Sequence, residues 1–159
     1  MASSPQLQRM MIPSPILMIC DGNLCRSPFA EFYLRKKFET AGTYAEVFSR
    51  GLLALPNRRA PKNGQLAASE LDIDLSTHVS QPLLRTDLDR AQMVFVMEPR
   101  QRQHLAKMSP GSIGKVFLLS QMTDGNPIAD PVGKDVDAFR SAYQVIVTDV
   151  DAWGKRFGI

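Results

Sequence analysis

The sequence predicts an α/β domain built on a parallel sheet. Short, continuous apolar runs at residues 16–19, 93–96 and 115–119 are typical of strands that are buried on both faces. Segments with helical spacing of apolar residues separate these runs, and this alternation favours parallel βαβ units with helices on both faces of one sheet. A chain of 159 residues, 44% of them hydrophobic, fits a single domain with one ordinary core.

The expected elements alternate along most of the chain. Strands are expected at 16–19, 46–49, 93–96 and 115–119, and helices at 29–38, 63–71, 99–108 and 136–157. The last helix is amphipathic, so one of its faces is expected in the core. Where the first helix begins, Ser27 is expected to be the N-cap, Pro28 the first helical residue and Glu31 part of the first turn.

The composition limits the cellular setting. Two cysteines are too few for a disulfide framework, and one cysteine pair without a histidine cluster does not form a structural zinc site. Residues 1–14 are expected to be a flexible leader before a domain at 15–159. No apolar run in the leader reaches the length of a signal sequence or a membrane span. We therefore expect a cytoplasmic protein that does not insert into membranes.

The charge favours an anionic substrate. The net charge is +3 and the pI is about 9.0. No run of Lys and Arg interleaves with aromatic residues, so the sequence does not indicate binding of nucleic acid.

The segment from Cys20 to Ser27 carries the strongest chemical signal. Cys20 lies at the carboxyl end of the first strand, where open α/β sheets bind ligands, and a short turn leads from it into a helix. Backbone N–H groups in such a turn form an anion-binding nest, and the helix start adds further donors. Arg26 adds a guanidinium that can hold two phosphate oxygens. The residues expected to bind phosphate are Asp21, Gly22, Asn23, Leu24, Cys25, Arg26 and Ser27.

These surroundings predict a covalent reaction at Cys20. A helix start and a nearby cation favour the thiolate, which can attack phosphorus and form a phosphocysteine, while the Ser27 hydroxyl donates to the sulfur. A leaving oxygen needs a proton, and Asp130 lies before Pro131 in the turn-rich segment 124–133. Pro131 favours an extended Asp130. Asp130 is therefore the predicted acid, and later the base that activates water.

The segment 20–28 resembles the phosphate loop of the low-molecular-weight protein tyrosine phosphatases. It has the form C-x5-R-S, and in full C-x-G-N-x-C-R-S-P, and Asp130-Pro131 falls where that family keeps its general acid. The resemblance continues through Ser49-Arg50-Gly51, residues 73–76, Val96-Met97-Glu98 and residues 114–117. It therefore covers nearly the whole chain after Pro15.

The resemblance implies both a fold and a set of roles. The fold would be a three-layer, Rossmann-like domain in which helices cover both faces of a four-stranded parallel sheet. The enzyme would need no metal or organic cofactor, would bind inorganic phosphate or other oxyanions in the loop, and would act on a phosphorylated protein. The supporting residues implied are Asn23, Ser27, Ser49 and His78, beside the catalytic Cys20, Arg26 and Asp130. Within the family, the sequence is most similar to the bacterial enzymes. This similarity suggests a tyrosine kinase of exopolysaccharide export as the substrate.

One departure from the family pattern concerns the substrate slot. The family usually has an aromatic residue directly after Asp-Pro, and here that residue is Val132. Tyr44 or Phe48 could supply the missing aromatic wall. Leu24, the other expected slot residue, is the larger aliphatic typical of the tyrosine phosphatases, whereas phosphoarginine phosphatases of the same fold tend to have a small threonine there. Phosphotyrosine is thus the expected substrate, with phosphoarginine as the alternative.

Two further functions remain as less favoured alternatives. An arsenate reductase of this fold passes oxidation to cysteines outside the loop, and this sequence has none after Cys25. A non-catalytic phosphate-binding module would need neither a thiolate nor an acid. Cys25 itself has two readings, as a small packing residue or as a thiol that traps an oxidised Cys20 in a reversible disulfide.

Overall fold

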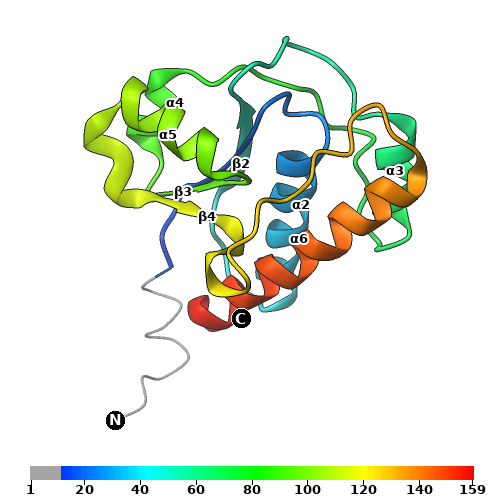
Figure 1. The fold of residues 1–159 in the computed structure, drawn as a ribbon. Helices are drawn as coiled ribbons and strands as arrows, with labels where there is room; N and C mark the ends of the chain where they lie inside the picture. Colours follow the sequence, from blue (N-terminus) through cyan, green and yellow to red (C-terminus); the bar gives the residue numbers. More distant parts are fainter. Residues whose placement is uncertain (1–11) are drawn as a thin grey trace.

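A four-stranded parallel sheet lies at the centre of the computed structural model, which describes residues 12–159 (Figure 1). The strands are β1 (Ile16–Cys20), β2 (Val47–Gly51), β3 (Met93–Val96) and β4 (Val116–Leu118), and their order in the sheet is β2-β1-β3-β4. All three strand pairs are parallel. The predicted fold class and the four strands are confirmed, with shifts of one or two residues at the ends of β1, β2 and β4.

Helices cover both faces of this sheet. They are α2 (Arg26–Thr40), α3 (Lys62–Ser69), α4 (Arg85–Arg90), α5 (Pro99–Met108) and α6 (Val136–Phe157), with short 3-10 turns at Pro110–Lys115 and Leu119–Met122. The predicted bounds of α5 and α6 are confirmed residue for residue. α4 was not expected, since only two of its six residues are buried and so short a helix carries no readable period.

The strand β1 divides the interior into two cores. Its residues Ile16, Met18 and Cys20 pack into a cluster with the buried faces of α2 and α6, whereas Leu17 and Ile19 pack into a second cluster with residues of α4 and α5. Side chains of a strand alternate between the two faces of a sheet, and here both faces are covered. This explains why β1 reads as a continuous apolar run.

The carboxyl ends of the strands define the edge where a site can form. The chain moves from β1 outward to β2 and then crosses to β3 on the other side, so a crevice opens beyond the end of β1. At the end of β2, Gly51 allows the backbone of β2 to lie close to the turn that follows β1. A Cβ at this position would lie 2.6 Å from the carbonyl oxygen of Asp21 and 2.9 Å from the backbone nitrogen of Asn23.

The start of the described chain packs on the domain. Residues 1–11, most of the predicted leader, lie outside the described residues. Ile12 packs against the larger core cluster, and the Ser14 hydroxyl accepts a hydrogen bond from the backbone N–H of Glu46. Among residues 12–159, no helix combines the length and the apolar character that crossing a bilayer requires.

Candidate active site

The turn after β1 forms a cradle of backbone donors. It begins at Cys20 and ends where α2 starts at Arg26, so the amino end of α2 adds its own free N–H groups. Within the described chain, the backbone N–H groups of residues 22–25 donate to no protein acceptor. Such a ring of free donors is an anion-binding nest.

The start of α2 differs from the prediction at Ser27. The N-cap is Cys25, without a side-chain cap, and the first turn contains no acidic residue, so both the Ser27 cap and Glu31 in the first turn were wrong. Ser27 lies inside the helix because its hydroxyl has another partner. Its Oγ lies 3.0 Å from Cys20 Sγ, and its backbone N–H donates to the same sulfur at 3.5 Å. Two groups of Ser27 therefore lie within hydrogen-bond distance of the sulfur.

Asn23 holds the turn from inside. It is fully buried, and its φ of 54° is the left-handed conformation that asparagine tolerates better than most residues. Its Nδ2 donates to Ser27 Oγ and to Ser49 Oγ, each at 2.9 Å, and its Oδ1 accepts from the backbone N–H of Gln81. Because Asn23 donates to Ser27, the hydroxyl proton of Ser27 is left for the sulfur of Cys20.

A buried histidine fixes the same turn from the other side. His78 Nε2 lies 2.7 Å from the carbonyl oxygen of Asn23. Burial lowers the pKa of His78 despite that hydrogen bond, so the ring is neutral at pH 7. A carbonyl only accepts, so Nε2 carries the proton, and His78 orients the turn without exchanging protons with the sulfur.

The hydrogen-bond chain ends on a carboxylate that the sequence did not reveal. Ser49 Oγ donates to Glu31 Oε1 at 2.6 Å, and Glu31 forms an ion pair with Arg35 one turn further along α2. Burial raises the pKa of Glu31, against hydrogen bonds from Ser49 and Arg35. Glu31 thereby fixes the direction of the Ser49 hydroxyl, which must donate to it and accept from Asn23.

The guanidinium of Arg26 is buried and only partly used by the protein. Its side chain is 1% exposed. Nη1 donates to Glu98 Oε2 at 3.0 Å and to the carbonyl oxygen of Ile128 at 2.8 Å. Nε and Nη2 are buried without any hydrogen-bond partner. An edge with two parallel free donors is the shape that binds two oxygens of one phosphate.

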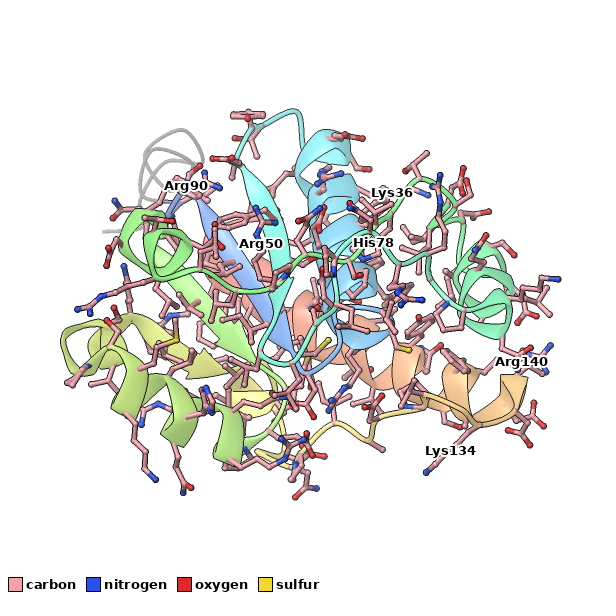
Figure 2. All side chains as sticks on the ribbon, turned by 90° about the horizontal axis from the view of Figure 1, so that it is seen from above. Lys36, Arg50, His78, Arg90, Lys134 and Arg140 are labelled. Carbon is pink, nitrogen blue, oxygen red and sulfur yellow. The ribbon has the colours of Figure 1, made fainter. Side chains whose placement is uncertain are left out.

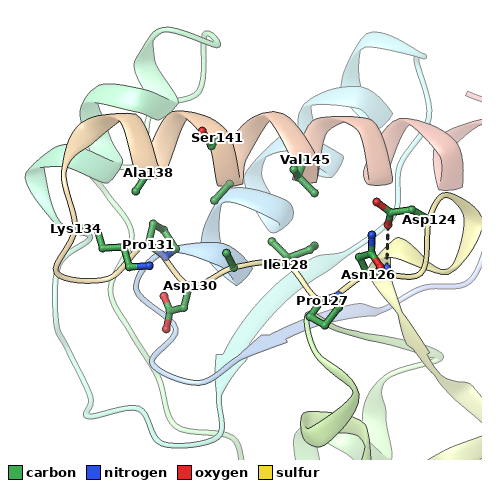
Figure 3. A pocket seen from close by; sticks show the side chains of 12 residues that line it. Asp124, Asn126, Pro127, Ile128, Asp130, Pro131, Lys134, Ala138, Ser141 and Val145 are labelled. Atoms are coloured by element: carbon green, nitrogen blue, oxygen red, sulfur yellow. Dashed lines mark hydrogen bonds between the residues drawn. The ribbon is translucent and has the colours of Figure 1, made fainter.

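Asp130 lies over the turn on the loop that precedes α6. Its Oδ2 lies 3.4 Å from Arg26 Nη2, and its Oδ1 accepts from the backbone N–H of Val132 in a local turn. Figure 3 shows the Asp130 carboxylate pointing away from α6, while Ile128 points toward that helix. The same loop, Asp130 included, also lines a second cavity of about 380 Å³ whose lining includes Ala138 and Val145 of α6.

Cys20 and Asp130 line one slot of about 220 Å³. It is lined by Cys20, Asp21, Gly22, Leu24, Cys25, Leu53, Asp130 and Val132. Val132 and Leu53 are 49% and 73% exposed, so the walls of the mouth are aliphatic. The suggestion that Tyr44 or Phe48 replaces the missing aromatic wall was wrong, because both line a different hollow beside Arg35.

Both cysteines are free, buried thiols in the described structure. Burial raises the pKa of Cys25 to about 12, so at neutral pH this group is a protonated thiol. The carbonyl of Cys25 accepts a hydrogen bond from the Tyr143 hydroxyl at 3.1 Å, and the Tyr143 ring stacks on Phe29 with centroids 4.1 Å apart. The helix α6 thus anchors the turn at its far end.

Sequence reasoning missed Glu31, Leu53, Glu98 and Arg100 as members of this site. Only Glu98 had a usable signal, since it follows β3 at the same sheet edge as Cys20. The contacts of the other three depend on the tertiary fold. Within residues 12–159, no three His, Cys, Asp or Glu side chains are grouped so that they could hold a metal ion.

Comparison with known families places the chain. The family described as low molecular weight phosphotyrosine protein phosphatase matches residues 15–158. The chain belongs to this family. Like other members of the low molecular weight phosphatase family, it is a single α/β domain with a four-stranded parallel sheet.

Relatives of this low molecular weight phosphatase cover most of its length. The "Probable low molecular weight protein-tyrosine-phosphatase EpsP" of Ralstonia nicotianae is 36% identical, over 89% of this chain and 94% of that protein. The solved structure of Vibrio vulnificus Wzb in complex with benzylphosphonate has a TM-score of 0.84 and 31% identity, over 91% of this chain and 99% of that one. A protein-arginine-phosphatase of Bacillus subtilis is 33% identical, over 79% of this chain and 84% of that protein.

Replacing Asn23 by alanine is expected to lower the free energy of unfolding by about 3 kcal/mol. The change leaves buried donors and acceptors unpaired and places alanine in a left-handed conformation. Urea denaturation followed by circular dichroism measures the loss. Asn57 is a matched control because it also has a positive φ, of 62°, but is exposed, so Asn57→Ala should cost only about 1 kcal/mol. Equal losses in the two variants would contradict a bracing role for the Asn23 side chain.

Proposed function

We propose that this chain hydrolyses phosphotyrosine on proteins through a phosphocysteine intermediate. The observation that carries the proposal is the free edge of Arg26. This edge is buried, and its Nη2 lies 3.4 Å from Asp130, which lines the slot together with Cys20. A sulfur that accepts from Ser27, a nest of backbone donors and a free guanidinium edge form a cradle for a phosphoryl group above a nucleophile.

In the first proposed step, Cys20 attacks and Asp130 donates a proton. The thiolate of Cys20 forms a bond to phosphorus while the bond from phosphorus to the tyrosine oxygen breaks. The proton of the Asp130 carboxyl goes to that oxygen, so tyrosine leaves as a neutral phenol. Arg26 and the backbone N–H groups hold the three remaining oxygens of the phosphoryl group.

In the second proposed step, water replaces the sulfur. Asp130, now a carboxylate, takes a proton from a water molecule whose oxygen attacks phosphorus. The sulfur–phosphorus bond breaks, the Cys20 thiolate is restored and inorganic phosphate leaves. Both steps use only side chains and water, so we propose a mechanism without a cofactor. Inorganic phosphate is then a product that also binds the empty loop, as other oxyanions would.

Asn23, Ser27, Ser49 and His78 are proposed to support this reaction by holding the turn and the sulfur. The supporting contacts are the hydrogen bonds from Asn23 to Ser27 and Ser49, and from His78 to Asn23. A reversible disulfide between Cys20 and Cys25 stays a prediction, as does a tyrosine kinase of exopolysaccharide export as the natural substrate.

Phosphoarginine is the second candidate substrate. It is favoured by the aliphatic walls at Leu53 and Val132 and by the similarity to a protein-arginine-phosphatase. Leu24 argues for phosphotyrosine, because a large aliphatic side chain lining the slot can pack against an aromatic ring but offers no hydrogen-bond acceptor to the guanidinium of phosphoarginine.

A comparison of two phosphopeptides with the same flanking sequence tests the substrate. We expect kcat/KM to be at least about tenfold higher for phosphotyrosine than for phosphoarginine, since the slot discriminates by shape. Phosphate release is the measurement, and Leu24→Thr is the informative variant, expected to narrow the ratio. A ratio below one in the unmodified enzyme would make phosphoarginine the substrate and leave the two chemical steps unchanged.

A further inference from the structure

Three carboxylates surround the single guanidinium that is proposed to bind phosphate. Glu98 Oε2 lies 3.0 Å from Arg26 Nη1, and Asp130 Oδ2 and Asp21 Oδ2 lie 3.4 and 3.8 Å from Nη2. A phosphate monoester adds a further charge of about −1.5 to −2 at neutral pH. Asp130 is neutral while it carries the proton for the leaving group, but Asp21 and Glu98 still offset the single charge of Arg26. A second cation beside these two carboxylates would therefore favour binding of this substrate.

The second cation is Arg100, at the start of α5. Its Nη1 and Nη2 donate to Asp21 Oδ1 and Oδ2 at 3.1 and 2.5 Å, and Nη2 also donates to Glu98 Oε2 at 2.5 Å. Gln101 donates to the same Asp21 carboxylate at 3.0 Å. The Arg100 side chain is 56% exposed and is not part of the slot lining, so it reaches the site through these two carboxylates.

The pKa values of Asp21 and Arg100 reflect their mutual ion pair. Burial by itself raises the pKa of Asp21, but hydrogen bonds from Arg100 and Gln101 and the charges of Arg100 and Arg26 outweigh it, so the pKa lies below its usual value. Asp21 and Glu98 in turn raise the pKa of Arg100, with the Asp21 hydrogen bond as the largest cause. Asp21 is therefore charged at neutral pH and is held by Arg100.

The position of Asp21 decides whether Arg26 stays available. At 3.8 Å, its carboxylate is too far from Arg26 Nη2 for a hydrogen bond, and Nη2 remains without a partner. If Arg100 were absent, the nearest cation for Asp21 would be Nη2. Asp21 would then occupy part of the edge that two phosphate oxygens need.

We propose that Arg100 is a positioning residue that holds Asp21 and Glu98 and so reserves the free edge of Arg26 for the phosphoryl group. The inference rests on the proposed function for the identity of the ligand, a phosphoryl group. It extends that function because an exposed residue outside the slot would then contribute to the affinity for the phosphoryl group.

The test is a double-mutant cycle of Arg100→Gln and Asp21→Asn, with inorganic phosphate as the ligand. Titration calorimetry measures phosphate binding without turnover, and p-nitrophenyl phosphate gives KM and kcat separately. We expect Arg100→Gln to weaken phosphate binding and raise KM about fivefold, the size of one partly exposed ion pair, with a smaller change in kcat. Asp21→Asn alone should bind phosphate at least as well as the unmodified enzyme.

The double variant separates positioning from direct contact. If Arg100 acts by restraining Asp21, removing the charge of Asp21 makes Arg100 dispensable, and the double variant should bind phosphate within about twofold of Asp21→Asn. Binding as weak as in Arg100→Gln alone would overturn the proposal and indicate that Arg100 contacts the ligand. Unchanged phosphate binding in Arg100→Gln would overturn it as well.

Two further variants guard the interpretation. Arg140→Gln removes an arginine from an exposed ion pair with Glu70, and Figure 2 shows Arg140 at the start of α6, on the other side of the molecule from α5. It should leave phosphate binding unchanged. Arg100→Lys keeps the positive charge but cannot make the bidentate contact with Asp21. Its affinity for phosphate should therefore lie between those of the unmodified enzyme and Arg100→Gln. If no aryl phosphate is turned over, the proposed function fails, while the calorimetric cycle still decides the role of Arg100.

Discussion

Replacing Cys20 by serine is expected to abolish turnover, with kcat falling by about 10⁴-fold or more. A thiolate attacks without a base, but a serine hydroxyl must first lose its proton. The groups that contact Cys20 Sγ are the Ser27 hydroxyl and backbone N–H, which are donors in this arrangement. His78 is committed to the carbonyl of Asn23 and cannot serve as the base. Release of p-nitrophenol measures the loss.

Two measurements make the loss in the serine variant interpretable. The variant should still bind inorganic phosphate, because Arg26 and the backbone donors are unchanged, and its unfolding midpoint should stay close to that of the unmodified protein. Turnover by Cys20→Ser at the unmodified rate would remove Cys20 as the nucleophile. Loss of both turnover and phosphate binding would point to a collapsed turn.

Replacing Asp130 by asparagine is expected to lower kcat on a phosphotyrosine peptide by about 10²- to 10³-fold, the usual share of general acid catalysis. Asparagine has the same shape and keeps the acceptor for the backbone N–H of Val132, so the local turn survives. It cannot give up a proton to the phenol. The loss should shrink for dinitrophenyl phosphate, whose leaving group departs as an anion without protonation.

Asp124 offers a matched control on the same loop. Its Oδ1 accepts from the backbone N–H of Asn126 at 2.9 Å (Figure 3), a local turn like that of Asp130. Asp124 is not among the residues that line the slot. Asp124→Asn should leave kcat unchanged on both substrates. An equal loss in kcat/KM on the two substrates in Asp130→Asn would remove Asp130 as the acid of the first step, because kcat/KM does not include the later hydrolysis of the phosphocysteine.

The parts of the fold that could be predicted depend on contacts between near neighbours in the chain. β1 was readable because both of its faces are buried, and α6 because one of its faces is apolar over 22 residues. The turn from Cys20 to Arg26 was readable because strand, donors and guanidinium lie within seven residues. Asp130 needed the family resemblance as well as the turn signal of Pro131.

The missed parts depend on residues that the fold brings together from far apart. Arg100 meets Asp21 across 79 positions, and Ile128 meets Arg26 across 102, and no periodicity reports such pairs. Ser27 was read as an N-cap because serine before proline is the local signal for one. The tertiary contact with Cys20 Sγ uses the same hydroxyl, and the helix begins at Arg26, two residues earlier than that signal implies.

The bond from Tyr143 to the carbonyl of Cys25 joins positions 118 apart in the chain. During translation, residues 20–26 of the phosphate loop are therefore synthesised long before Tyr143, the residue that braces the loop. A nascent chain that has emerged only as far as α5 has the nucleophile but lacks the brace, the acid loop and the carbonyl of Ile128 that holds Arg26. Competence for catalysis thus arrives late in synthesis, when α6 docks.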